Sequence, residues 1–70
     1  MYVEFWTNTK GKMRVIAVIR ADGQIEEKEP LPPRIREDIE DQRRRVPGKR
    51  FLESLPAEFS GSYYWAILKD

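Results

Sequence analysis

Five cationic side chains and no acidic one lie between positions 43 and 50 of this 70-residue chain. The run reads Arg43, Arg44, Arg45, Val46, Pro47, Gly48, Lys49, Arg50, and Phe51 follows it directly. Guanidinium and ammonium groups bind phosphate oxygens through charge-assisted hydrogen bonds, and a neighbouring aromatic ring can stack on a base. The run therefore predicts a candidate nucleic-acid contact made by Arg43, Arg44, Arg45, Lys49, Arg50 and Phe51.

The arginines also have an explanation that needs no ligand. Three of them fall in the last turn of an expected helix, where positive charge interacts favourably with the negative end of the helix dipole. Glu40 and Asp41 precede them at the spacing at which helical side chains pair. The formal net charge of the chain is only +1, whereas nucleic-acid-binding domains carry a clear excess of cations. Nucleic-acid binding is therefore the alternative prediction.

Few residues in the chain are suited to catalysis or metal binding. Histidine and cysteine are absent, so the commonest general base, a strong nucleophile and the usual zinc ligands are missing. The acidic residues between positions 37 and 41 point around a helix and not toward one point. Glu58, Tyr63 and Tyr64 are the residues to test for catalysis. We predict no enzymatic activity, no cofactor and no bound metal.

The length of the chain limits the structure that can present these groups. A chain of 70 residues buries only about 60% of the surface that it exposes when unfolded, so residues 1–70 are predicted to form a single domain. Without disulfides or a metal site, association with a partner is the remaining way to stabilise so small a core. The apolar run of residues 15–19 is far shorter than the ~20 residues that span a membrane. We expect a cytoplasmic protein without membrane contact.

A hairpin of two strands, residues 2–6 and 13–20, is predicted from their β-branched and aromatic residues and from the polar loop between them. Apolar residues occupy both alternating sets of positions in the second strand. If Phe5 lies opposite Met13, one face of the sheet carries Val3, Phe5, Met13, Val15, Ala17 and Ile19. The other face then carries Tyr2, Glu4, Trp6, Arg14, Ile16, Val18 and Arg20.

A third strand is predicted over residues 24–28. The preceding Ala21-Asp22-Gly23 fits a three-residue hairpin turn that ends with glycine in the left-handed conformation. This turn places Ile19 opposite Ile25, which puts apolar residues together. The charged composition of the strand suits an exposed sheet edge.

One amphipathic helix is predicted over residues 34–45, after a proline at the first helical position and before Pro47-Gly48. Residues 49–55 are expected to form a short helical turn that Pro56 interrupts. Residues 63–68 are apolar on both faces and predict an interior or covered strand. The predicted fold class is α+β, with an antiparallel β-sheet of three to four strands packed against one amphipathic helix in the order β-β-β-α-β.

The function depends on what covers the second face of this sheet. Residues 51–59 could fold over it, or it could stay open and bind a second copy or another protein. In a third alternative Tyr2 and Trp6 stack on unpaired bases while Arg14 and Arg20 contact phosphates. We predict a small non-enzymatic interaction or regulatory protein that acts through protein contacts, with a homodimer as one form. The candidate interface consists of Tyr2, Trp6, Arg14, Ile16, Val18 and Arg20.

Overall fold

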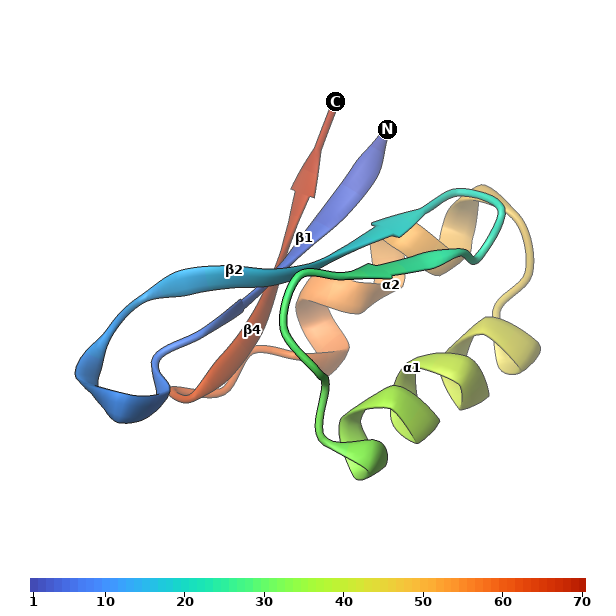
Figure 1. The fold of residues 1–70 in the computed structure, drawn as a ribbon. Coiled ribbons are helices and arrows are strands. Elements are labelled where there is room, and N and C mark those ends of the chain that lie inside the picture. Colours follow the sequence, from blue (N-terminus) through green and yellow to red (C-terminus); the bar gives the residue numbers. More distant parts are fainter.

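The computed structural model describes residues Met1 to Asp70 and contains one four-stranded antiparallel sheet and two α-helices (Figure 1). The strands are β1 (Tyr2–Thr7), β2 (Arg14–Arg20), β3 (Ile25–Glu27) and β4 (Tyr64–Lys69). The helices are α1 (Pro33–Arg45) and α2 (Lys49–Glu58), and a short 3-10 turn, η1 (Thr9–Gly11), joins β1 to β2. The predicted α+β class is confirmed, with a second helix inserted so that the order is β-β-β-α-α-β.

The first strand of the chain lies in the interior of the sheet, whose strand order is β3-β2-β1-β4. Tyr2 at the start of β1 pairs with Arg20 of β2 on one side and with Lys69 of β4 on the other. The two chain ends therefore lie side by side, at the top of Figure 1. Strands from opposite ends of the sequence thus form one continuous hydrogen-bonded unit.

β4 is an edge strand, so for residues 63–68 the interior alternative is wrong, whereas α2 covers one face of the strand. Its outer edge is covered only in part, where the Ala66 N–H donates to the Phe59 carbonyl at 2.9 Å and Ser60 forms a bridge with Trp65. The apolar composition has a different cause, because α2 packs on one face of β4 and buries Ala66. The other face carries Trp65 and Ile67 outside the core.

The turn between β2 and β3 follows the predicted geometry. Ile19 pairs with Ile25 as expected, and Gly23 adopts a φ of 90° while its N–H donates to the Arg20 carbonyl at 2.9 Å. The Asp22 carboxylate accepts the backbone N–H of Gln24 at 3.0 Å. A left-handed residue closes the turn, and glycine adopts that conformation without the steric cost that a side chain imposes.

The hairpin between β1 and β2 contains a β-bulge that the sequence pattern did not predict. Phe5 pairs with Ala17 and Trp6 pairs with Val15, so Ile16 is an extra residue without a partner in β1. The predicted pairing of Phe5 with Met13 is wrong, and Met13 lies outside the strand with 62% of its surface exposed. Since a bulge breaks the alternation of side chains, Ile16 and Ala17 are both buried while Val15 is not.

Both helices pack on the same face of the sheet, so residues 51–59 do not cover the second face. The buried residues form one apolar cluster between the sheet and the two helices, namely Val3, Phe5, Ile16, Ala17, Ile19, Leu31, Ile39, Phe51, Leu52, Leu55 and Ala66. The prediction that Pro56 interrupts the helical turn is also wrong, because α2 continues to Glu58. Pro56 removes one backbone donor, and the burial of Leu52 and Leu55 by α2 offsets that loss.

Candidate functional site

One face of the sheet has no helix or loop packed against it. We call it the open face, and it consists of Tyr2, Glu4, Trp6, Val15, Val18, Arg20, Glu26, Lys28, Trp65, Ile67 and Lys69. Every one of these residues is at least partly exposed. The opposite face, by contrast, contains all of the fully buried apolar strand residues. The sheet is therefore closed on one side and available on the other.

Two tryptophans form a ridge on the open face, over β1 and β4. Trp6 and Trp65 lie opposite each other in the strand register, and their rings are stacked with centroids 6.2 Å apart and planes inclined by 13°. The Trp6 Nε1–H donates to a Glu4 carboxylate oxygen at 3.4 Å. Ile67 extends the ridge along β4 and is 36% exposed. Large rigid aromatic surface of this kind gives protein interfaces much of their binding energy.

A shallow groove lies beside the ridge, over β1, β2 and β3. It encloses about 430 Å³, and its floor is formed by Val15 and Val18. Its sides are formed by Tyr2, Glu4, Arg20, Glu26 and Lys28. The open face thus has an aromatic half, whose two tryptophans are half-buried, and a hollow aliphatic half.

Charges of both signs surround this apolar surface. Lys69 Nζ lies 3.8 Å from a Glu4 oxygen, and Arg20 Nη2 lies 3.0 Å from a Glu26 oxygen. Lys28 forms no ion pair. Because Glu4 sits in the middle of the face, between the ridge and the groove, a phosphate backbone laid across the strands would meet a carboxylate.

Four of the six predicted interface residues lie on the open face, namely Tyr2, Trp6, Val18 and Arg20. Ile16 is a correction, because the bulge turns it into the core, where it is only 3% exposed. The sequence reasoning missed Val15 for the same reason. It also missed Trp65, Ile67 and Lys69, whose spacing of two placed them on one face of a strand without indicating which face.

Arg14 is the second correction, since it has a structural role beside the β1–β2 loop. Its Nε and Nη2 donate to the two carboxylate oxygens of Glu29 at 2.6 and 3.1 Å. Its Nη1 donates to the backbone carbonyls of Thr9 and Lys12, both at 2.9 Å. The hydrogen bond from Arg14 lowers the pKa of Glu29 below its ordinary value, and the same bond raises the pKa of Arg14. The guanidinium is fully engaged and is not available to a phosphate.

The basic run does not act as one patch. Phe51 is a correction, because it is 1% exposed within the core and cannot stack on a base. Arg44 and Arg45 pair with Asp41 at 3.5 and 3.1 Å, as the explanation without a ligand predicts. Glu40 takes no part, because it pairs with Arg36 at 3.6 Å.

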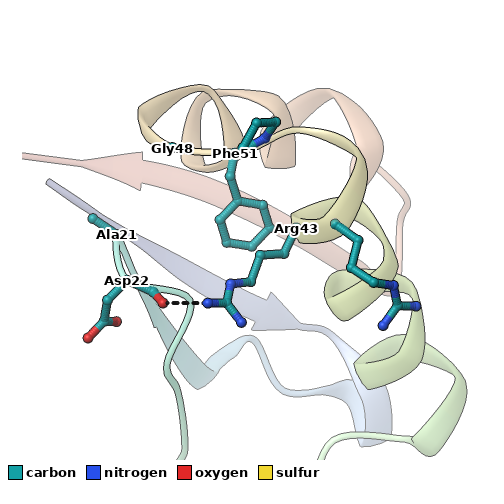
Figure 2. Close-up of a pocket in the computed structure, with 7 residues that line it drawn as sticks. Ala21, Asp22, Arg43, Gly48 and Phe51 are labelled. Carbon is teal, nitrogen blue, oxygen red and sulfur yellow. Dashed lines mark hydrogen bonds between the residues drawn. The ribbon is translucent and has the colours of Figure 1, made fainter.

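Arg43 connects α1 to the turn between β2 and β3. Its Nη2 donates to the Asp22 carbonyl at 3.0 Å, and Figure 2 shows the side chain reaching across to that turn. A Cβ atom on Gly23 would overlap the Arg43 guanidinium. The turn therefore favours glycine for its backbone conformation, and a side chain at this position would displace the Arg43 guanidinium.

A small hollow remains near the end of the basic run. It encloses about 320 Å³ between the β2–β3 turn and the adjoining ends of the helices, and its lining includes Asp22, Arg43, Arg44 and Gly48 (Figure 2). Lys49 and Arg50 follow in the first turn of α2, exposed and without an ion pair. These two side chains are the members of the predicted nucleic-acid contact that no structural role occupies.

The residues considered for catalysis do not come together. Tyr64 lies in the core layer, stacked 6.2 Å from the Phe5 ring, whereas the Tyr63 side chain is exposed. Glu58 lies on the exposed end of α2. No group of three or more acidic side chains is arranged to hold a metal ion.

Neither helix is long and apolar enough to cross a lipid bilayer. Comparison with models of protein families, with curated proteins and with solved structures gave no match. The chemistry of the described surfaces is therefore the basis for a functional proposal.

Proposed function

We propose that the protein is a small, non-enzymatic interaction or regulatory protein that binds a protein surface through the open face of its sheet. The observation that carries the proposal is the half-buried, stacked Trp6–Trp65 pair with the exposed Ile67 beside it, on the sheet face opposite the one that the two helices close. Removing apolar surface from water stabilises a small domain by about 25 cal/mol per Å². Two indoles left outside the core indicate a surface that is buried in a complex.

The charges on the open face favour a protein over a nucleic acid. Arg20, Lys28, Lys69 and Glu26 lie around the edge of the apolar surface, and Glu4 lies near its middle, 3.8 Å from Lys69. Protein interfaces combine an apolar centre with a polar rim of this mixed kind. A surface for single-stranded nucleic acid instead combines stacking rings with a continuous cationic groove.

Nucleic-acid binding at the basic run is the second candidate. Lys49 and Arg50 support it, because they are exposed, unpaired and placed at the start of a helix, where the dipole does not favour cations. The loss of Phe51 to the core and the pairing of Arg44 and Arg45 with Asp41 weaken it. We place either activity in the cytoplasm, because a chain without cysteine is compatible with a reducing compartment.

Photo-crosslinking tests the open face as a binding surface. A benzophenone amino acid replaces Ile67 on the open face, and in a matched control it replaces Glu37, which is exposed on α1. Irradiation in the cells that produce the protein should give a discrete protein adduct at position 67 and none at position 37. The absence of an adduct at position 67, or the same adducts from both positions, would contradict the proposal.

A further inference from the structure

We propose that the occupant of the open face is a second copy of this chain, packed face to face about a two-fold axis. The inference rests on the proposed function and names its partner. The tryptophan ridge and the groove lie side by side on one surface, so a single molecule presents both an aromatic and an aliphatic half. In an isologous dimer the same surface of both molecules meets, so the aromatic half of each molecule can pack on the aliphatic half of the other and the contact occurs twice.

The strand order defines the axis that brings these two halves together. A two-fold axis that runs parallel to the strands, between β1 and β2, places β4 of one molecule over β3 of the other. It also places the Trp6 side chain over the partner's Val15, which is the residue opposite Trp6 in its own sheet. Two sheets packed in this way lie ~10 Å apart and interdigitate their side chains. Trp6 of each molecule then packs on the partner's Val15, once on each side of the axis.

The same axis arranges the rim charges favourably. The register places Ile67 of β4 over the partner's Glu26 on β3, and Lys69, two residues further along β4, comes within reach of that carboxylate. Lys28 comes over the partner's Trp65, where an ammonium group is attracted to the indole face. Glu4 faces the partner's Val18, so the central carboxylate does not meet a second one. No charge on the open face is placed directly against its like.

The size of the open face sets the expected affinity. Strand spacings of ~4.8 Å and rises of ~3.4 Å per residue give a footprint of roughly 20 by 20 Å. Two such faces cover roughly 800 Å² in total, which lies below the standard size and in the range of weak, transient interfaces. We therefore expect a dissociation constant on the order of tens of micromolar or weaker, and not an obligate dimer.

Sedimentation equilibrium of the full chain over a concentration series tests the dimer directly. The mass should rise from 8.3 kDa toward twice that value at tens of micromolar and above. Trp65→Ala and Val18→Arg should each weaken association by roughly tenfold or more, whereas Glu37→Ala on the outside of α1 should leave it unchanged. Far-UV circular dichroism checks that every variant is folded.

Reversing the charge at position 69 or at position 26 tests the position of the axis. The test compares the same two variants alone and mixed, so an effect on folding cannot produce the expected result. Lys69→Glu alone and Glu26→Lys alone should each weaken self-association, because each creates two like-charged contacts across the axis. An equimolar mixture of the two variants should associate more tightly than either one alone, because in the mixed dimer both contacts join opposite charges. A mixture that associates no better than the separate variants would overturn the proposed axis.

The outcomes separate this inference from the function on which it rests. A mass of 8.3 kDa at every concentration, together with a position-67 adduct to a different protein, overturns the second copy and leaves the proposed function standing. The same monomeric mass without any adduct overturns both. Quenching of tryptophan fluorescence by a single-stranded oligonucleotide, lost in Trp65→Ala, would assign the open face to nucleic acid and overturn both as well.

Discussion

The bulge in β2 makes opposite predictions for two neighbouring apolar residues. Ile16 is 3% exposed and belongs to the core, whereas Val15 lies half-buried in the groove. Ile16→Ala should therefore lower the free energy of unfolding by about 2–4 kcal/mol, the usual cost of removing a buried isoleucine side chain to Cβ. Val15→Ala removes two methyl groups from a partly solvated site and should cost less than about 1 kcal/mol.

These costs are large for a chain of this size. A 70-residue domain has a total stability of roughly 3.5–10 kcal/mol, and each 1 kcal/mol shifts its melting temperature by about 4–8 °C. Ile16→Ala should therefore melt at least about 8 °C below the parent protein. Ile16→Val removes a single methyl group and should cost about 0.5–1.5 kcal/mol, which gives an intermediate point if the alanine variant is too unstable to measure.

Urea unfolding followed by far-UV circular dichroism gives the required free energies. It should be performed at the lowest protein concentration that the signal allows, so that the monomer is measured and dimerisation does not contribute. The expected order of destabilisation is Ile16→Ala, then Ile16→Val, then Val15→Ala. If Val15→Ala costs more than Ile16→Ala, the strand alternates without a bulge. Val15 would then belong to the core and not to the groove, and the residues assigned to the open face would be wrong.

Three further predictions concern the turn, the loop and the basic run. Gly23→Ala should lower stability by about 1–2 kcal/mol, because alanine is strained at a positive φ and its methyl group displaces the Arg43 guanidinium. Arg43→Ala should therefore destabilise the Gly23→Ala variant less than it destabilises the parent protein, as urea midpoints will measure. Glu29→Gln should be destabilising at neutral pH, because the pKa of Glu29 is lower in the folded than in the unfolded protein, and thermal melts should show the difference vanishing as the pH falls below about 4. If the basic run binds oligonucleotides, replacing Lys49 and Arg50 with glutamine should weaken binding more than replacing the two arginines paired to Asp41, as titrations at several salt concentrations will measure.

Each of these predictions has a clear contrary result. Equal costs of Arg43→Ala in the parent and in the Gly23→Ala background would mean that the two residues are not in contact. If the stability difference between Glu29→Gln and the parent protein stays constant from neutral to acidic pH, the ion pair with Arg14 does not stabilise the fold. Equal losses from both pairs of basic residues would show that the ion pairs to Asp41 do not restrain those arginines.

The parts of the fold that the sequence predicted are those determined by local chemistry. The Ala21-Asp22-Gly23 turn fixed the pairing of Ile19 with Ile25, because only one turn geometry puts like residues opposite each other. Helix α1 ends at Arg45 as predicted, because Val46 precedes a proline and is biased away from helical geometry.

The parts that the sequence did not predict depend on packing between distant segments. The polar loop before β2 left the register of the first hairpin undetermined, so the bulge at Ile16 could not be anticipated from alternation. Pro56 is a helix breaker by local propensity, yet burial of Leu52 and Leu55 against the sheet maintains α2 through it. Four of the six interface residues were found, and the missing half of the site, with Trp65, depended on which strand lies beside β1.

The central position of β1 has a consequence for how the molecule folds. Tyr2 pairs with Lys69, so during synthesis β1 stays unpaired along one edge until β4 has also been made. Contacts between residues so distant in sequence slow folding, because the intervening chain must be ordered before they form. During this interval β1, with Phe5 and Val3 ready for the core, offers a free apolar edge to other nascent chains. A circular permutant that joins Asp70 to Met1 through a short linker would make β4 and β1 a local hairpin, and it should fold faster than the natural order.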